Sequence, residues 1–249
     1  MKSLFRACFL LCFLSANAQY NFNGTVKRDS VFYTKAYLSL VENYQELHRI
    51  SENQIINVSD IDSLGNFQFT GNNLPETPSF YRIHLGSEED ATPFLYDSEL
   101  GHNFVLFKST NHDTIRIVKS RNKVLFGKLT SINNPNIGVI MELDSLQHQL
   151  FENAQVYRSK KQEELFYKNY YKKLKAFCGN YQDPLLNLVT VSFFNKADDA
   201  QQTHFINDFK ASPEFYINTL KALEKDYPDK KFTQVFQREI EFLKLKLDG

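Results

Sequence analysis

Histidine is the residue type from which acid–base or metal chemistry would most readily be built in this chain. Catalytic triads and zinc sites bring histidine together with a nucleophile, a carboxylate or further metal ligands. No G-x-S-x-G, H-E-x-x-H, P-loop or G-x-G-x-x-G motif occurs. We therefore predict no catalytic, cofactor-binding or metal-ligating residue and no cofactor, and we expect the chain not to be an enzyme. The histidines that this prediction covers are His48, His84, His102, His112, His148 and His204.

Cysteine offers a second route to chemistry, and Cys178 is the candidate. Cys8 and Cys12 lie in an N-terminal segment that we expect to be removed, which leaves Cys178 without a partner for a disulfide, a C-x-x-C pair or a cysteine-based zinc site. Cys178 lies in "AFCGNY" at a predicted helix C-terminus, where the helix dipole disfavours a thiolate, although nearby lysines could offset this effect. We predict a buried and unreactive thiol.

Two acidic residues, Asp60 and Asp62, match the D-x-D start of a calcium loop. The next ligand position holds Leu64, and the twelfth residue counted from Asp60 is Gly71, where an EF-hand needs a bidentate glutamate. In "DSLGNFQF", Asp62 can accept backbone hydrogen bonds, and Gly65 can take the positive φ that closes a hairpin through a bulge. This pattern favours a hairpin turn over a calcium site.

His112 and Asp113 are adjacent and could supply a ligand or a base. They lie in residues 109–113, which separate two strand-like runs at 104–108 and 114–118. Histidine–aspartate pairs in such positions are more often exposed turn residues than catalytic groups. We predict a second hairpin here, with an exposed turn.

The N-terminal segment resembles a secretory signal. Lys2 and Arg6 precede an apolar run at 7–14, and the small-x-small pattern that ends at Ala18 is one that signal peptidase cuts. Lipidation at Cys12 is disfavoured because large leucines precede it. The sequence therefore predicts export to the periplasm or cell surface, with residues 1–18 removed and no stable membrane span afterwards, since no later stretch approaches the ~20 apolar residues that a spanning helix needs.

The charge balance excludes one class of partner. The whole chain carries 29 basic and 29 acidic residues, so loss of Lys2 and Arg6 leaves a net charge of about −2 with the histidines neutral. Nucleic-acid binding needs a concentrated basic surface, which this balance does not supply. We expect no nucleic-acid partner, and another envelope protein is a possible partner. The oligomeric state is left open.

Short runs of β-branched and aromatic residues dominate the first half of the chain, and turn residues separate them. In "NFQF" and "TIRI" apolar and polar residues alternate, which is typical of strands with one buried face. We predict an antiparallel β-sandwich over residues 19–130. The predicted strands are 20–26, 36–41, 54–58, 67–70, 80–85, 104–108, 114–118 and 124–129.

From about residue 133 the apolar residues recur at intervals of three and four, which indicates helices. One long helix is expected from about residue 137 to 177, with an interruption near Asn153. Asp183-Pro184 and Ser212-Pro213 each pair a capping residue with a first-turn proline, so helices are expected at 184–195 and 213–226. A last helix is expected at 231–247, and residues 198–210 lie between helices. The fold class is thus α+β, with an all-helical module at 131–249.

Residues 158–177, "RSKKQEELFYKNYYKKLKAF", mix lysines with aromatic residues and could lie on an anionic surface. However, the spacing that a helical core face requires is found in Leu165, Tyr167, Tyr171, Leu174 and Phe177. We therefore favour a helix with one buried face and a solvated lysine face.

Several short segments resemble a family of exported bacterial proteins. They are "YNFNGTV", "AYLSL", "DSLGNFQFTG", "FYRIHL" and "FYINTLKALEKDYPDKKFTQVFQREI". Residues 19–247 are similar to the uncharacterised N-terminal β-domain and helical connector of thioredoxin-like thiol-disulfide oxidoreductases. The family's redox domain and its C-x-x-C pair have no counterpart up to Gly249, so the resemblance implies a fold and a compartment but no redox activity.

These observations lead to two functional hypotheses. The first is a non-enzymatic binding or interaction module in the cell envelope, of unknown specificity. The second is an accessory protein of a periplasmic thiol-redox or stress-response system that acts with a separate thioredoxin-like partner. A sensor ectodomain would require a membrane segment that this sequence does not contain.

Overall fold

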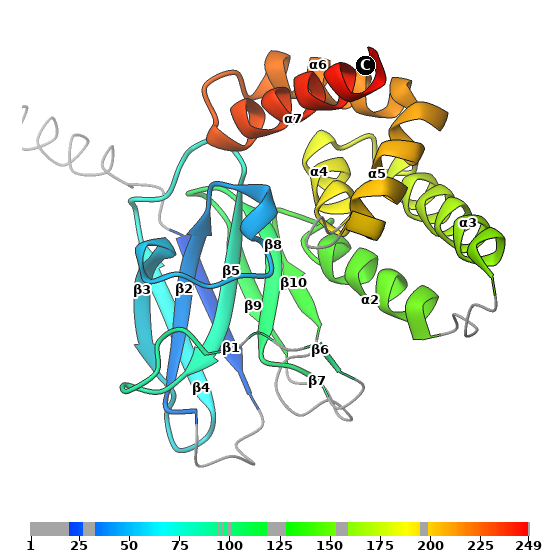
Figure 1. Cartoon of the computed structure of the whole chain (residues 1–249). Helices are drawn as coiled ribbons and strands as arrows, with labels where there is room; N and C mark the ends of the chain where they lie inside the picture. Colours follow the sequence, from blue (N-terminus) through cyan, green and yellow to red (C-terminus); the bar gives the residue numbers. More distant parts are fainter. Residues whose placement is uncertain are drawn as a thin grey trace, which may run out of the picture.

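The computed structural model describes residues 20–26, 33–93, 95, 97–98, 101–118, 128–152, 159–194 and 199–248. The expected signal segment, and most of the strand expected at 124–129, lie outside these residues. The described chain runs from strands to helices, which confirms the α+β class (Figure 1).

Two four-stranded sheets form the N-terminal half. Each strand pairs antiparallel with its neighbours, except that β1 and β9 pair in parallel. The first sheet contains β10 (Leu129–Ser131), β9 (Thr114–Ile117), β1 (Tyr20–Thr25) and β4 (Asn66–Gly71), in that order. The second contains β3 (Ile55–Asp60), β2 (Lys35–Val41), β5 (Ser79–Gly86) and β8 (Phe104–Ser109). A separate short pair joins β6 (Asp97–Ser98) to β7 (Gly101–His102).

The alternation in the sequence sets which side chains fill the space between the sheets. Phe67 and Phe69 of β4 are buried while Gln68 is exposed, and Ile115 and Ile117 of β9 are buried in the same way. These residues belong to one apolar cluster that takes side chains from both sheets. The expected strand pattern is confirmed at these positions.

Strand β5 is buried along its whole length because both of its faces are covered. Tyr81, Ile83 and Leu85 point into the core between the sheets. The opposite face carries Phe80 and, further along, Arg82 and His84, neither of which is exposed to solvent. This second face is where the rest of the chain packs on the sandwich.

The turn at residues 62–66 has the local geometry that the sequence predicts. Gly65 has a φ of 86°, and Asp62 Oδ1 accepts hydrogen bonds of 2.8 Å from the backbone N–H groups of Leu64 and Asn66. The turn does not close a two-stranded ladder, however, because β3 and β4 belong to different sheets. It joins the edge strands of the two layers, so the hairpin prediction is wrong in its pairing.

The second hairpin prediction is also wrong in its pairing. Strand β8 pairs with β5 in one sheet, whereas β9 pairs with β1 and β10 in the other. The turn between them is shaped by Asp113, whose Oδ2 accepts hydrogen bonds from Ser109 Oγ at 2.7 Å and from the N–H of Thr110 at 2.8 Å. Asp113 is consequently buried, not exposed as expected, while His112 is exposed.

Six helices follow the strands among the described residues. The helix expected at 137–177 with an interruption near Asn153 is described as two helices, one ending at Glu152 and the next beginning at Lys160. Residues 199–210, for which the sequence predicts no helix, form most of α5. Asp183 caps α4 by accepting a hydrogen bond from Leu185 N–H, but Ser212 makes no side-chain cap at α6. The helices are α2 (Val139–Glu152), α3 (Lys160–Gly179), α4 (Pro184–Ser192), α5 (Asp199–Ala211), α6 (Pro213–Asp226) and α7 (Lys231–Asp248).

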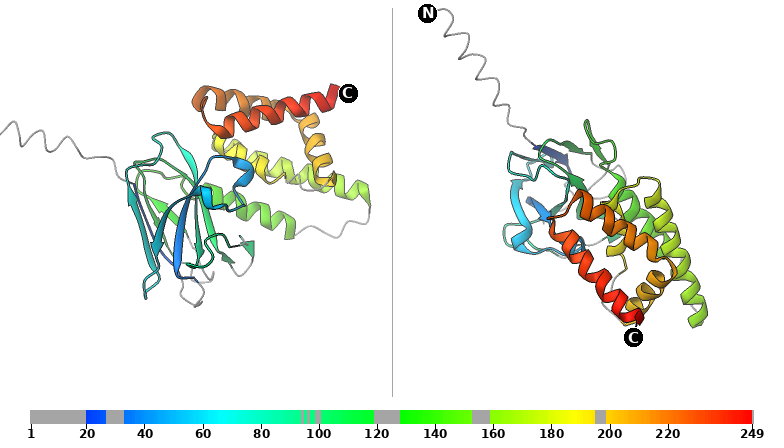
Figure 2. Two further views of the ribbon diagram at one scale, coloured as in Figure 1. Left: turned by 60° about the vertical axis from the view of Figure 1, so that its left-hand side comes forward. Right: turned by 90° about the horizontal axis from the view of Figure 1, so that it is seen from above.

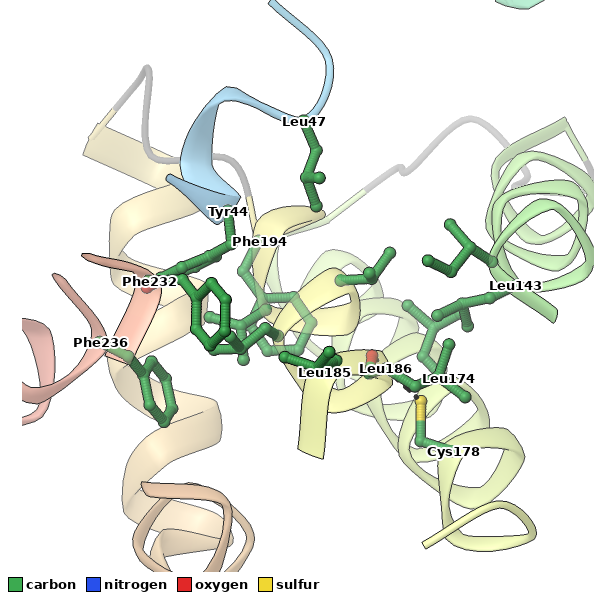
Figure 3. Packing of buried hydrophobic residues seen from close by; sticks show 14 of the residues in the cluster. Tyr44, Leu47, Leu143, Leu174, Cys178, Leu185, Leu186, Phe194, Phe232 and Phe236 are labelled. Atoms are coloured by element: carbon green, nitrogen blue, oxygen red, sulfur yellow. Dashed lines mark hydrogen bonds between the residues drawn. The ribbon is translucent and has the colours of Figure 1, made fainter. Parts of the chain in front are cut away.

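The helices pack against the second sheet and share a core with it (Figures 1 and 2). In this core, Phe80 of β5 lies edge-on to Phe232 of α7, and Tyr44, from the 3-10 helix η1 (Tyr44–Glu46), lies edge-on to Phe236. Figure 3 places Tyr44 beside the α7 aromatics and Leu185 of α4 near the centre of this cluster. The ion pair between Lys108 of β8 and Asp183 joins the same two parts at the surface.

Candidate binding site between helices α3 and α5

A groove of about 230 Å³ lies between α3 and α5. Each helix supplies four residues at positions i, i+3, i+4 and i+7, which is the spacing of one helical face. Glu164, Tyr167, Lys168 and Tyr171 come from α3, and His204, Asn207, Asp208 and Ala211 come from α5.

An aromatic stack forms one wall of the groove. The rings of Tyr167 and His204 lie 4.0 Å apart between centroids and 23° from parallel. His204 is only 8% exposed, and its Nε2 lies 3.2 Å from Oε1 of Glu163. Tyr167 thus contacts the face of the imidazole and Glu163 contacts its edge, and these two contacts fix the position of the ring in the groove wall.

Asp208 forms the deepest charged contact of the groove. Both of its carboxylate oxygens lie 2.7 Å from Lys175 Nζ, and Oδ2 also accepts a 2.6 Å hydrogen bond from Tyr216 of α6. Burial, and secondly the Asp208 charge, raise the pKa of Tyr216 well above its ordinary value. Behind the groove, Tyr216 therefore keeps its proton, and the charge of Asp208 is balanced by that of Lys175.

Tyr171 contributes the polar group that is least satisfied by the protein. It is 3% exposed and lines the groove, and its hydroxyl has no hydrogen-bond partner among the described residues. Burial, followed by the neighbouring Tyr170 and Asp208, raises the pKa of Tyr171, so the hydroxyl keeps its proton at neutral pH. Because Tyr171 lines the groove, its hydroxyl can form a hydrogen bond with a water or a ligand there.

The rim of the groove offers groups that are free to bind. The Asn207 side chain is exposed and has no partner within the described part of the chain. Glu164 and Lys168 are also exposed and carry opposite charges. The groove thus combines ring carbons, one tyrosine hydroxyl, an amide and a balanced pair of charges.

The sequence predicted no site residue, and the groove residues were missed as a set. The sequence places Tyr167 and Tyr171 on the core face of a helix, and no motif surrounds His204. The signal that could have found them is the repeated spacing in "HFINDFKA", residues 204–211, once that segment is recognised as a helix. Without α5, no second wall could be inferred.

The other described histidine side chains lie apart from one another. His112 pairs with Glu76 on the surface, His148 lies 2.7 Å from Glu152 one turn along α2, and His48 packs edge-on to Phe104. His84 is buried against Tyr37, with ring centroids 5.2 Å apart. Within the described residues, no group of three or more His, Cys, Asp or Glu side chains could hold a metal ion.

A wider hollow of about 690 Å³ lies over the outer face of β1, β4 and β9. Its polar groups largely bind one another: Gln68 donates a 3.0 Å hydrogen bond to Asn21, and Thr25 donates one of 2.9 Å to Asn66. Asp60 pairs with Lys35, and Asp62 is used by its own turn. Apart from Arg116, whose exposed side chain also lines the hollow, the polar groups of this surface are largely engaged already.

Cys178 is buried at 1% exposure, as expected. Its sulfur lies 2.8 Å from Thr190 Oγ1 and packs near Leu174 and Leu186 (Figure 3). Burial raises the pKa of the thiol to about 11, although the contact with Thr190 acts in the opposite direction. The low reactivity of this thiol stays a prediction.

Helix α3 agrees with the sequence interpretation except at Leu165 and Lys175. Tyr171 and Leu174 are buried, Tyr167 and Phe177 are half-buried, and the other described lysines of the helix are exposed, whereas Lys175 is mostly buried in its ion pair. Leu165, which the sequence interpretation places on the buried face, is 59% exposed, because it lies two residues before Tyr167 and thus about 200° away around the helix. No helix within the described ranges combines the length and apolar character needed to cross a bilayer.

Comparison with protein-family models, with curated proteins and with solved structures finds no match to this chain. The resemblance to the front half of exported thioredoxin-like oxidoreductases is therefore neither supported nor contradicted by these comparisons.

Proposed function

We propose that this protein is a non-enzymatic binding module of the bacterial cell envelope and that the groove between α3 and α5 is its binding site. The observation that carries the proposal is the Tyr171 hydroxyl, which belongs to a side chain that lines the groove and has no hydrogen-bond partner among the described residues. Because such a group gains a hydrogen bond when a ligand arrives, it favours an occupied groove.

The chemistry of the groove favours binding over turnover. Asp208 is held by Lys175 and Tyr216, and His204 by Glu163 and the Tyr167 ring. A general base must instead be able to take a proton from a substrate. Cys178, the thiol outside the predicted signal, is buried beneath other side chains and is absent from the lining of the groove. We therefore assign the groove a recognition role.

The envelope location depends on the N-terminal segment. Lys2, Arg6, the apolar run at 7–14 and the cleavage pattern at Ala18 support export. In a Gram-negative host, we expect the protein in the periplasmic or surface fraction with Gln19 as its first residue. Mass spectrometry of the N-terminal peptide checks this expectation, and an intact Met1 in the cytoplasmic fraction would contradict it.

The binding role can be tested by filling the groove. Ala211 is exposed at the last position of α5 and lines the groove, so Ala211→Trp should block it without disturbing the core. Leu165→Trp is the matched control, because it adds the same side chain at an exposed position of α3 outside the groove. Thermal unfolding would be measured with and without small molecules extracted from bacterial envelopes.

We expect the extract to raise the unfolding temperature of the wild-type chain and of Leu165→Trp, because a ligand that binds only the folded state stabilises it. The shift should be absent in Ala211→Trp. An equal shift in Ala211→Trp, or no shift in any of the three proteins, would overturn the assignment of the groove.

A role as an accessory to a separate thioredoxin-like partner is a second candidate. It is favoured by the end of α7, where Phe242 is 42% and Leu245 is 73% exposed, so a partner protein could cover apolar surface there. Affinity purification of the tagged chain from an envelope fraction should then recover a protein with a C-x-x-C pair, and Leu245→Glu should lose it. Recovery of no such protein would count against this candidate.

A further inference from the structure

We propose that the groove between α3 and α5 recognises a single neutral sugar residue. This inference rests on the proposed binding role and names the class of ligand. Three properties of the groove lead to it: its size, its charge and the arrangement of its hydrogen-bonding groups around aromatic rings.

The size of the groove limits the ligand to about one ring. Its volume of about 230 Å³ is below the range of roughly 300–1,000 Å³ that is usual for pockets that hold drug-sized molecules. A dinucleotide, a haem or an extended oligomer would not be enclosed. One monosaccharide unit, free or at the end of a glycan, is of a suitable size.

The charges of the groove disfavour an ionic ligand. Asp208 is neutralised by Lys175 directly behind it, with side-chain exposures of 7% and 13%. Glu164 and Lys168 oppose each other on the rim. A phosphate or a carboxylate would find no unpaired buried cation here, and an amine would find no unpaired buried carboxylate, so an uncharged ligand is favoured.

The polar groups suit a ligand with several hydroxyls. The Tyr171 hydroxyl can donate and accept, the Asn207 amide can donate and accept, and Asp208 Oδ1 has a single described partner, Lys175. A sugar hydroxyl is also both donor and acceptor, so it can satisfy each of these groups in turn. A purely apolar ring would displace water from the Tyr171 hydroxyl without replacing its hydrogen bond.

The aromatic side chains suit the apolar face of the same ligand. A pyranose ring carries C–H groups on its faces and hydroxyls around its edge. Tyr167 and Tyr171 present ring carbons in the groove, and the stack of Tyr167 on His204 holds one of these rings in place. The aromatic rings can therefore contact the C–H face of the sugar, while the neighbouring polar groups bind the hydroxyls at its edge.

The test uses the folded chain and four uncharged probes: glucose, galactose, mannose and N-acetylglucosamine. Backbone amide NMR shifts would be recorded during titration up to tens of millimolar. We expect at least one sugar to shift the amides of α3 and α5 around residues 164–171 and 204–211. Tyr171→Phe should weaken that binding about two- to tenfold, as expected for the loss of one hydrogen bond.

Tyr227→Phe is the matched control, because Tyr227 lies at the end of α6 outside the groove and its hydroxyl also has no described hydrogen-bond partner. It should bind the sugar as the wild type does. Shifts in α3 and α5 that are equal for Tyr171→Phe and the wild type would overturn the sugar assignment.

Two further probes separate the failure of this inference from the failure of the binding role. Phenylalanine tests a zwitterion held by Glu164 and Lys168, and inorganic phosphate tests an anion. If either shifts the groove amides while no sugar does, the sugar class is wrong and the binding role stands. If none of the six probes shifts them, the sugar inference is overturned, and the Ala211→Trp comparison decides the binding role separately.

Discussion

Tyr216 donates a 2.6 Å hydrogen bond to Oδ2 of Asp208 and thereby joins α6 to α5 behind the groove. Lys175 of α3 reaches the same carboxylate, so three helices meet at one buried charge. Removal of the carboxylate alone leaves the lysine without its counter-ion.

We predict that Asp208→Ala lowers the free energy of unfolding by about 3–5 kcal/mol, because a buried charge is left uncompensated. Replacing both charges by apolar side chains, in the double variant Asp208→Leu with Lys175→Met, should cost less than the single change. Urea denaturation of the three proteins tests the order. A double variant that is less stable than Asp208→Ala would contradict it.

Arg82 supports the loop that covers the outer face of the second sheet. Its Nη1 lies 2.9–3.2 Å from the carbonyl oxygens of Glu46, Leu47 and Arg49, and its Nη2 donates a 2.6 Å hydrogen bond to Gln54. Burial lowers the pKa of Arg82 to about 10, so the side chain remains charged at neutral pH.

Replacing Arg82 with methionine should therefore cost at least about 3 kcal/mol, since several buried carbonyls lose their donor at about 1–3 kcal/mol each. Arg116→Met is the matched control on the outer face of β9, where the side chain is exposed and makes no hydrogen bond or ion pair with another described residue. Its effect should stay within about 0.5 kcal/mol. Similar losses in the two variants would refute the role given to Arg82.

His84 should make the fold sensitive to mild acid. Its Nε2 donates to the carbonyl oxygen of Ala91 at 2.9 Å, and its buried Nδ1 has no partner in the described structure. Burial is the main reason that the pKa of His84 falls from 6.5 to about 4, and the charge of Arg82 lowers it further. The unfolded chain therefore binds a proton at a higher pH than the folded chain does.

Because the folded pKa is the lower one, the contribution of His84 to stability is complete above pH 6.5 and is lost as the pH falls towards 4. Between about pH 7.5 and pH 5 the loss is about 2 kcal/mol. His84→Gln removes this titration, so its unfolding free energy should depend less on pH over the same interval. Identical pH profiles for the two proteins would show that His84 is not the group responsible.

Gly65 is required by the turn that joins the two sheets. Its φ of 86° disfavours any side chain, and a Cβ there would lie 2.2 Å from the carbonyl oxygen of Val26. Gly65→Ala should destabilise the fold by at least about 1–3 kcal/mol. Gly138→Ala is the control, since its Cβ would have no neighbour closer than 3.8 Å. Equal unfolding midpoints for the two variants would contradict this account.

The thiol of Cys178 should react slowly in the folded protein. Burial raises its pKa to about 11, so little thiolate forms near neutral pH, and the neighbouring side chains exclude reagents. We expect an aromatic disulfide reagent to label the native chain far more slowly than the urea-unfolded chain. Labelling at the rate of a free cysteine in the native state would disprove the prediction.

The sequence predicts which strand residues are buried better than it predicts which strands pair. Alternation in "NFQF" and "TIRI" reports the face of each side chain, and those faces are confirmed. It carries no information on the sheet to which a strand belongs. Both turns that looked like hairpins cross from one sheet to the other, because the partners of β4 and β9 come from β1, far away in the sequence.

The groove could not be predicted from the sequence because helix α5, which forms one of its walls, could not be predicted either. Its sequence, "DAQQTHFINDFKA", contains threonine, histidine, asparagine and two aspartates, which are weak helix formers. It forms a helix because Phe205 and Phe209 are buried against the aromatic core that α3 and α6 provide. Tertiary packing, and not local helix propensity, therefore stabilises α5, which supplies half of the residues that line the groove.

The parallel pairing of β1 with β9 has a consequence for how the chain acquires its shape. The first strand to be made is an interior strand of its sheet, and its two neighbours arrive only with residues 66–71 and 114–117. Contacts between such distant segments form late and slowly. Until then the apolar residues of β1 stay uncovered, so a chain that is translocated from its N-terminus would depend on chaperones for that interval.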